Sequence, residues 1–598
     1  TLSEVVVIGY GVQLKKDLTG SVSVVPTKEI GSLPVPSVSD AIQGRAAGVQ
    51  VISSGVPGSD ATIRIRGVGT INNNDPLLVI DGVPVSSGLN QLNMNDIESI
   101  QVLKDASATA IYGARASNGV ILITTKKGDL QKTSVNLNTS YGWQTMPGER
   151  MLDLMNAEQW NEYKGTDVQG TDTDWMDEIL QVAPTSNTEL SVSSGNDKTR
   201  LFISGSYYNQ DGTVKGTSYD RYSGRLNVDH KLRSNLTVGG GITMNYSKNR
   251  RVEGDQTLFG PLPNALSIPA IYPVYNEDGS YNEDGPYANP VAIYKETNNV
   301  AFTNRNNGNI FLEYKFLNGF TFTTKWGADI YNLREHGYDP VTTRQGAKYN
   351  GLCIEGTSYV SNLVSSNVLQ YIQTLSEKHN IEVMAGYSFE KYAKRNTYIE
   401  AIDFPNENFE YIESAGVIRA ASSSSLDRGM NSYFGQLKYN FLYKYIITLT
   451  ARADGSSKFG ENNQYGYFPA ASLAWRVSQE PFMKQFTAIN ELKIRATIGL
   501  TGNDGIPDFS SPGLYEGGFN YGGNSGIAPT QLPNPDLKWE TTTQSGLGLD
   551  VSVLDSRISL NADVYLNKTK DLLLARPLPP STGFNSIYAN IGNLENRG

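Results

Sequence analysis

The stretch NIFLEYKFLNGFTFTTKWGADI, residues 309–330, holds two alternating segments joined by the tight link LNG at 317–319. The first segment has apolar residues at every second position, namely Ile310, Leu312, Tyr314 and Phe316. The second segment repeats this alternation with Phe320, Phe322, Trp326, Ala328 and Ile330. Polar residues such as Glu313, Lys325 and Asp329 alternate with them. Because successive side chains of a strand point to opposite faces, the stretch predicts a β-hairpin with one apolar and one polar face.

The same pattern recurs around 491–498 and 557–567, so the hairpin belongs to a large repeated system. Alternation alone also fits a soluble sandwich of two sheets. The connections favour another fold, because tight links such as 317–319 and 554–557 alternate with long loops. The long loops run over roughly 249–303, 332–356, 395–426 and 500–538. Short turns at one end and long loops at the other are typical of a transmembrane antiparallel β-barrel.

The composition agrees with a β-rich chain. Among 598 residues there are 59 glycines and 34 tyrosines, but only 3 histidines and 1 cysteine. A net charge of −10 argues against a nucleic-acid surface. No apolar run approaches the roughly 20 residues that a transmembrane helix needs, whereas a barrel strand leaves a much weaker hydropathy signal.

The N-terminal part has a different pattern. Residues 38–51 begin with a predicted cap at Ser39 and continue with helical spacing up to Gly48. The segments 61–67 and 75–85 are predicted strands, and the second enters an Asp-Gly turn. Residues 95–128 alternate between short helices and strands, which predicts a small α+β domain with a mixed sheet. A wide barrel leaves a water-filled bore, so we expect this domain to plug it.

The first residues, EVVVIGYG at 4–11, invite comparison with a dinucleotide-binding turn. Gly9 and Gly11 fit that motif, and Glu29 lies near the offset of a ribose-binding acid. Leu14 occupies the position of the third glycine, and the following residues form a β segment instead of a helix. Two hypotheses remain for an extended β-branched tail: an ordinary edge strand, or a strand that adds to the sheet edge of a partner.

Several motifs together resemble the SusC/RagA-like group of TonB-dependent outer-membrane transporters of Bacteroidetes. They are EVVVIGYG, DAIQGRAAGVQV, IRIRGVGTINNNDPLLVIDGVPV, NDIESIQVLKDASATAIYGARASNGVILITTKKG, RADGSSKFGENNQYGYFPAASLAWRVSQEPFM, NPDLKWETTTQSGLGLDVSV and STGFNSIYANIGNLENRG. These motifs span the whole chain, and in combination they are specific. The resemblance implies three parts: a TonB-box region at 1–12, a plug at 13–128 and an outer-membrane barrel at 129–598.

The resemblance favours strand addition for the N-terminal segment. It implies that periplasmic TonB, energised by inner-membrane proteins, pairs with Glu4, Val5, Val6, Val7 and Ile8. It also implies a complete barrel of about 22 strands, whereas we count about fifteen in this chain. An unfinished sheet would expose unpaired backbone groups to lipid, so we expect the last strands to lie beyond residue 598. A small β domain common before the TonB box in this group is absent from the sequence.

The resemblance further implies active import of a bulky nutrient across the bacterial outer membrane, with loops outside the cell and the TonB-box region in the periplasm. A glycan or oligosaccharide is the expected substrate, and an oligopeptide is the alternative. A SusD-like surface lipoprotein is the expected lid over the extracellular mouth. From a different class, a secreted β-rich glycan-binding protein or glycosidase also fits the composition, although no pair of carboxylates can be singled out for catalysis.

Candidate site residues come from the plug. Amide, hydroxyl and carboxylate groups in its loops could bind sugar or peptide, or could simply form turns. These residues are Asn72, Asn73, Asn74, Asp75, Ser86, Ser87 and Gln91. Four plug arginines could hold the plug to acidic groups of the barrel wall. They are Arg45, Arg64, Arg66 and Arg115.

No catalytic residue, cofactor or metal site is predicted. Cys353 is expected to be a packing residue, because a lone cysteine is more often buried than nucleophilic. His230, His336 and His379 lie far apart and lack partners at metal-ligand spacing. The segment YNEDGSYNEDG at 275–285 lacks the closing glutamate of a calcium loop.

Overall fold

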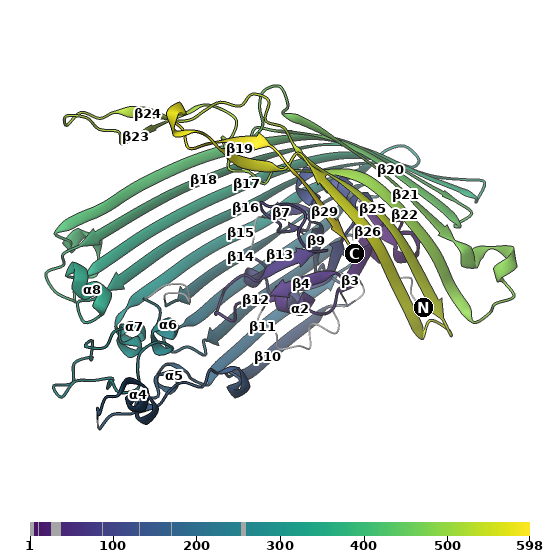
Figure 1. The fold of residues 1–598 in the computed structure, drawn as a ribbon. Helices are drawn as coiled ribbons and strands as arrows, with labels where there is room; N and C mark the ends of the chain where they lie inside the picture. The colour runs from purple at the N-terminus through teal and green to yellow at the C-terminus, as the bar shows by residue number, and fades with distance from the viewer. Residues whose placement is uncertain are drawn as a thin grey trace.

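The computed structural model describes residues 5–598 apart from residues 10, 26–36, 86, 87, 131, 169 and 253–258. One large curved sheet, here called the wall, encloses a small N-terminal domain, the plug, on its concave side (Figure 1). The predicted barrel with a plug inside it is therefore confirmed. Among the described residues, none of the helices combines the length and the apolar character that a bilayer crossing demands.

Over the described residues the wall contains sixteen strands, each antiparallel to its neighbours and ordered as they follow in the chain. Its strands are β10 Ser134–Gln144, β11 Ala183–Gly195, β12 Thr199–Asp211, β13 Ser218–Arg233, β14 Leu236–Arg250, β15 Asn298–Lys315, β16 Phe320–Asp339, β17 Leu352–Leu375, β18 His379–Ile402, β19 Val417–Phe441, β20 Tyr445–Ser456, β21 Tyr465–Arg476, β22 Ile489–Asn503, β25 Glu540–Val553, β26 Ile558–Lys570 and β29 Asn593–Arg597. This is one more than the expected count of about fifteen. The five residues of β29 are too few to display a clear alternation.

The two faces of the wall are reversed relative to a soluble protein. On the outer face, Ile310 is 67% and Trp326 57% exposed, although both are large and apolar. On the inner face, charged residues such as Asp329, Lys493 and Arg495 are buried against the plug. A sandwich would seal its apolar faces together, so the sandwich alternative is wrong. An apolar outer band with a polar interior is the arrangement of a lipid-embedded barrel.

The two ends of the wall differ, as the sequence predicts. One end, the short-turn end, has tight links such as 376–378 and 442–444, and the other, the loop end, carries the long connections. The expected loops at 332–356 and 395–426 are nevertheless too long, since the structure has them at 340–351 and 403–416. Strands β17, β18 and β19 contain 24, 24 and 25 residues. A bilayer crossing needs only about ten, so these strands continue well beyond the lipid, where no apolar alternation marks them.

The plug is built on a mixed sheet of five strands in the order β3-β8-β9-β6-β7, with β6 parallel to β9. Its elements are β3 Val22–Val25, α2 Val38–Ile42, β4 Val49–Ile52, β5 Thr62–Ile65, β6 Leu77–Ile80, β7 Val83–Val85, β8 Ile97–Leu103, α3 Ala106–Thr109 and β9 Val120–Thr125. The core includes the fully buried Ile100, Val102 and Ile121. The mixed α+β plug is thus the predicted one.

Helix α2 differs from its prediction at both ends. Ser37, two residues before the expected Ser39, accepts the hydrogen bond of the cap from the amide of Asp40. The helix ends at Ile42 because the next residue, Gln43, has a ψ of 125°, outside the helical region, and Gly44 follows with a φ of +71°. Ser39 is instead buried within the helix.

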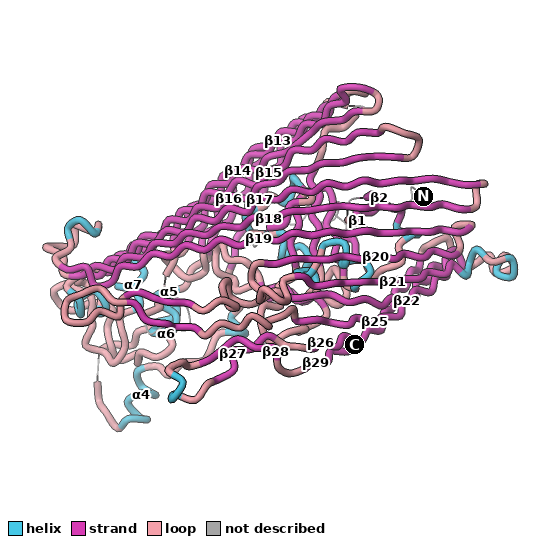
Figure 2. Tube along the Cα trace, turned by 90° about the horizontal axis from the view of Figure 1, so that it is seen from above, coloured by secondary structure: helices cyan, strands magenta, loops and turns pink. Residues whose placement is uncertain are grey.

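The loop end of the wall carries short elements of its own. They are α4 Ala157–Lys164, α5 Trp175–Ile179, α6 Pro261–Ala265, α7 Pro290–Glu296, α8 Arg344–Tyr349, β23 Leu514–Gly517, β24 Ile527–Gln531, β27 Leu573–Pro577 and β28 Ser586–Asn590. Figure 2 shows α4 to α7 gathered at this end, opposite the N-terminus. Buried Trp175 of α5, Ala265 of α6 and Val291 of α7 belong to one apolar cluster. These loops therefore form a packed cap and not a set of independent turns.

Candidate functional site

The N-terminal segment forms a small hairpin. Strand β1, Val5–Ile8, pairs antiparallel with β2, Gly11–Leu14, and Val6 lies opposite Gln13. Glu4 lies outside the described residues. Within the described part of the chain β1 pairs with β2 alone, so its second edge remains available for another strand.

Tyr112 of the plug holds this hairpin by hydrogen bonds. The amide of Gly9 donates to Oη of Tyr112 at 2.8 Å, and Oη lies 3.3 Å from the carbonyl oxygen of Gly9. Gly9 has a φ of +62°, and a Cβ at this position would lie 3.1 Å from Ile111. A glycine is required here by both the left-handed backbone and the close approach.

The hairpin lies at the short-turn end of the wall. Nζ of Lys438 donates to Oε1 of Gln13 at 2.7 Å, and Lys438 is close to the turn at 442–444. The N-terminus is drawn at that same end in Figure 2. The hairpin therefore faces the compartment beneath the barrel.

The residues after the hairpin bind the wall through polar contacts. Lys493 Nζ donates to the carbonyl oxygen of Leu18 at 3.2 Å, and Thr19 Oγ1 lies 3.2 Å from Thr448 Oγ1. Ser21 Oγ donates to Asp563 of β26 at 3.0 Å. The carboxylate of Asp563 is itself held by Arg495 of the wall at 3.0 Å. Arg495 also pairs with Asp550 of the wall at 2.9 Å.

Elsewhere, wall side chains hold the plug mainly by donating hydrogen bonds to the backbone carbonyl oxygens of the plug. Arg452 donates to the carbonyl oxygen of Ile111 at 2.7 Å, and Lys325 to that of Asp81 at 3.0 Å. Further wall side chains that donate to plug carbonyls are Arg221, Asn227, Asn249, Asn362, Gln544, Thr569 and Asn596. Each bond is worth about 1 kcal/mol, so the plug is held firmly by many contacts that can break one at a time.

The four predicted plug arginines behave differently from one another. Arg115 forms an ion pair with Glu390 of the wall. The guanidinium of Arg66 lies 4.5 Å from the ring centroid of Tyr565 in the wall, which is a cation–π contact. Arg64 pairs with Asp75 inside the plug, and Arg45 is exposed. The ion pair of Arg115 is thus compatible with the prediction that plug arginines anchor the plug to acidic groups of the wall.

Several of the predicted substrate-binding residues already make hydrogen bonds within the plug or to the barrel domain. Asn74 is buried; its Oδ1 accepts from the amides of Gly69 and Thr70. Asn72 donates to the carbonyl oxygen of Leu573 at 2.8 Å. Asn73 and Asp75 are exposed, while Ser86 and Ser87 lie outside the described residues. Gln91 Oε1 accepts from Arg305 at 3.5 Å. A role of these residues toward a solute remains a prediction.

Sequence analysis missed a cavity of about 180 Å³, lined by both polar and apolar residues, near the loop end of the wall. Its lining includes Arg251, Asn299, Glu335, Arg344 and Tyr398. Arg251 pairs with Glu335 at 2.8 Å. Glu335 belongs to the same face of β16 as Lys325, so the cavity opens toward the interior of the barrel. The signal that could have identified this cavity is the position of Glu335 on the inward face of a long strand.

Comparison with known proteins identifies the family. Residues 14–120 match the TonB-dependent Receptor Plug Domain family, and residues 255–598, more than half of the chain, match the family described as TonB dependent receptor-like, beta-barrel. The chain belongs to the TonB-dependent receptor family. Its similarity to SusC and to RagAB supports the SusC/RagA-like resemblance of its motifs, and its plug-and-barrel architecture is that of bacterial outer-membrane proteins.

Individual relatives support this assignment. The receptor is 37% identical over 619 residues to TonB-dependent receptor P3 of Formosa agariphila, covering 100% of this chain and 61% of the relative. It is 33% identical over 657 residues to TonB-dependent receptor SusC of Bacteroides thetaiotaomicron, covering 100% of this chain and 64% of the relative. The chain thus spans about three fifths of the length of the curated relatives it matches.

Solved structures show the same fold. A structure of the RagAB peptide transporter superposes with a TM-score of 0.88 at 25% identity, over 97% of this chain and 71% of the other. The ferric enterobactin receptor of Pseudomonas aeruginosa, at 15% identity and a TM-score of 0.60, shares the fold alone. The barrel family and the curated relatives are all described as TonB-dependent receptors, and this assignment replaces the glycosidase alternative.

Proposed function

We propose that the receptor actively imports a bulky hydrophilic nutrient, with an oligosaccharide as the first candidate, across the outer membrane. The observation that carries this proposal is the direct link from the N-terminal hairpin, through Tyr112, to a plug that fills a polar bore. A static pore would need no such connection. A chain that transmits force from beneath the membrane does need one.

In this proposal TonB pairs with the free edge of β1 in the segment Glu4–Ile8 and pulls it away from the barrel. The pull first loads the two contacts of Gly9 with Tyr112, and then the contacts of Leu18, Thr19 and Ser21 with the wall. Because these are single hydrogen bonds loaded in sequence, they can break one after another. Part of the plug then moves, and the solute passes through the polar bore.

An oligopeptide is the second candidate substrate. It is favoured by the high structural similarity to the RagAB peptide transporter and by the mixed charges of the cavity, where Arg251 and Arg344 lie near Glu335. The charged side chains of such a cavity could bind the carboxylates and amines of a peptide. A sugar would instead contact the neutral amide and tyrosine side chains of the cavity.

A surface lipoprotein of the SusD type is the proposed partner. The packed cap of α5, α6 and α7 and the protruding hairpin of β23 and β24 offer it a large docking area at the loop end. The two proteins should co-purify in mild detergent. Isolation of the receptor alone under all such conditions would contradict this partnership.

Deletion of residues 4–8 tests transport itself. Cells that carry the deletion should assemble the barrel normally but fail to grow on the one nutrient that it imports. Growth of a knockout strain on separate panels of polysaccharides and peptides distinguishes the two substrate classes. Normal uptake by the deletion strain would contradict TonB-driven import.

A further inference from the structure

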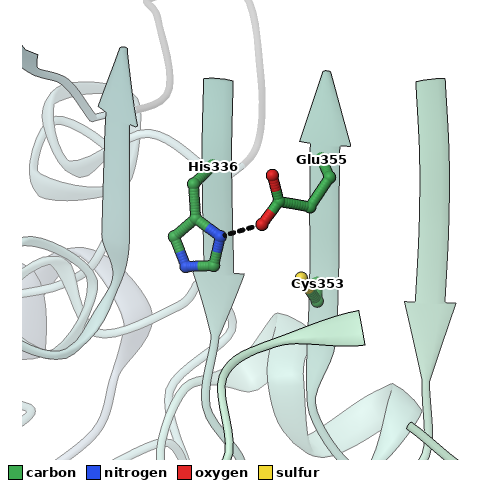
Figure 3. Close-up of side chains that lie close together, drawn as sticks. All are labelled: His336, Cys353 and Glu355. Atoms are coloured by element: carbon green, nitrogen blue, oxygen red, sulfur yellow. Dashed lines mark hydrogen bonds and ion pairs between the residues drawn. The ribbon is translucent and has the colours of Figure 1, made fainter. Parts of the chain in front are cut away.

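Three potential metal ligands meet near the loop end of the wall (Figure 3). His336 lies near the end of β16, and Cys353 and Glu355 lie at the start of β17. Their ligand atoms all lie within 4.8 Å of one another. The strand register explains the cluster, because His336 is directly opposite Glu355 and Cys353 is two residues away on the same face.

This cluster is covered and lies outside the lipid. It belongs to the outer face of the wall, but it is sixteen residues beyond the first residue of β16, which is more than a bilayer crossing requires. The segment 403–416 folds over it, and Cys353 packs with Tyr338, Ala401 and Phe404 in a buried group. A cation bound here would be shielded from water on most sides.

Both nitrogens of His336 have a carboxylate near them. Nδ1 and Oε1 of Glu355 point toward one another at 2.7 Å, and the Cys353 side chain lies beside them (Figure 3). Nε2 is buried without a hydrogen-bond partner among the described residues, and it lies 3.7 Å from Oε2 of Glu410. If a metal occupies Nδ1, the imidazole proton resides on Nε2 and can be donated to Glu410. This is the carboxylate–histidine–metal arrangement common around bound zinc.

We propose that His336 Nδ1, Cys353 Sγ and Glu355 form a binding site for a divalent cation of the zinc class. A set of one sulfur, one nitrogen and one oxygen donor suits Zn²⁺ and disfavours Ca²⁺ and Mg²⁺, which take oxygen ligands. Binding forms a metal–sulfur bond and releases the thiol proton to water, with no change of oxidation state. A water molecule completes the four ligands.

The site would fasten three parts of the loop end together. Two ligands come from β17 and one from β16, while Glu410 extends from the segment 403–416 that covers them. The cation would hold this segment against the wall and so stabilise the rim that faces the proposed lid.

The full chain in detergent micelles provides a direct test with Zn²⁺ and Co²⁺ as the probes. Co²⁺ bound to a thiolate has a sulfur-to-metal charge-transfer absorption, and Cys353 is the only cysteine of this chain. The variants Cys353→Ser, His336→Gln and the isosteric Glu355→Gln remove one ligand each. His379→Gln is the matched control, because His379 contacts Tyr439 at the short-turn end instead.

The wild-type chain should bind a single Zn²⁺ and show the Co²⁺–thiolate band. Each ligand variant should weaken Zn²⁺ binding at least about tenfold, and Cys353→Ser should abolish the band, whereas His379→Gln should change neither. The heat-dependent electrophoretic mobility of barrels verifies that every variant is folded. A Co²⁺ complex without the thiolate band, or equal Zn²⁺ affinity of the wild-type and Cys353→Ser chains, overturns the proposal.

Discussion

Asp81 of the plug and Arg225 of the wall form a buried ion pair, with 2.6 Å between Oδ2 and Nη2. The arginine side chain is only 3% exposed. The same carboxylate accepts hydrogen bonds from the amide and hydroxyl of Thr125, so it joins two plug strands and the wall at one point.

Replacement Asp81→Asn should loosen the plug. It leaves the charge of Arg225 buried without a counter-ion, which should cost about 3–5 kcal/mol of stability. Urea titration with pulse proteolysis of the plug measures the loss. As a control, Lys568→Gln breaks the exposed pair with Glu595 and should cost less than about 1 kcal/mol. Equal effects of the two changes would contradict the anchoring role of Asp81.

Replacement Tyr112→Phe should release the N-terminal hairpin. The change removes one hydroxyl and both contacts with Gly9, at a cost of about 1 kcal/mol. Trypsin should then cleave after Lys15 and Lys16 several times faster. Tyr163→Phe, at an exposed position in α4, serves as the control. An unchanged cleavage rate would show that Tyr112 does not restrain the segment.

Replacement Val6→Pro should abolish transport without unfolding the barrel. Proline lacks the amide hydrogen that strand addition requires. Val6→Thr keeps both the backbone amide and the β-branched shape, and it should support growth on the imported nutrient. If both variants grow alike, the pairing with TonB is centred elsewhere.

Charges on the outer face should be tolerated according to depth. Ile310 lies six residues before Phe316, which precedes a short turn, and both point outward. At about 3.3 Å per residue and a 45° tilt, Ile310 is roughly 14 Å deeper in the membrane. Ile310→Arg should therefore destabilise the barrel by about 2–4 kcal/mol, and Phe316→Arg by about 0–1 kcal/mol. Urea unfolding from phospholipid vesicles compares them, and the reverse order would refute the membrane placement.

The thiol of Cys353 should be unreactive in the folded chain without metal. Burial, reinforced by Glu355 and Glu410, raises its pKa from 9.0 to about 12. In buffer with EDTA at pH 8, iodoacetamide should modify the unfolded but not the folded chain. Above about pH 9 the unfolded thiol ionises first, so this group should lower stability as pH rises toward 12. Rapid labelling of the folded chain would contradict the burial.

The alternating pattern was sufficient to predict the wall, because lipid and plug demand opposite chemistry on its two faces. The polar face of Lys325 and Asp329 was predicted correctly for this reason. The ends of β17 and β18 could not be predicted, since both faces of a strand become polar beyond the lipid. Helix α2 was misjudged because its backbone leaves the helical region at Gln43, five residues before Gly48.

The sites were harder to predict than the fold. His336 and Glu355 are nineteen residues apart in sequence and become neighbours only through the β16–β17 register, which no local spacing reveals. The contacts between wall and plug were not predicted for a second reason. The prediction concerned arginines of the plug, whereas donors such as Arg452 lie on the wall. A carbonyl acceptor has no sequence signature, because every residue carries one.

The recognition of plug carbonyls by wall side chains has an evolutionary consequence. Arg452, Lys325 and Lys493 hold Ile111, Asp81 and Leu18 by atoms that any amino acid would present. Surface residues of the plug that make no side-chain contact of the kind made by Asp81 can therefore diverge among descendants without loss of docking, provided that the backbone path is kept. A substitution of one of these wall residues removes the donor itself. Selection should therefore constrain the wall donors more strongly than the plug residues that they bind.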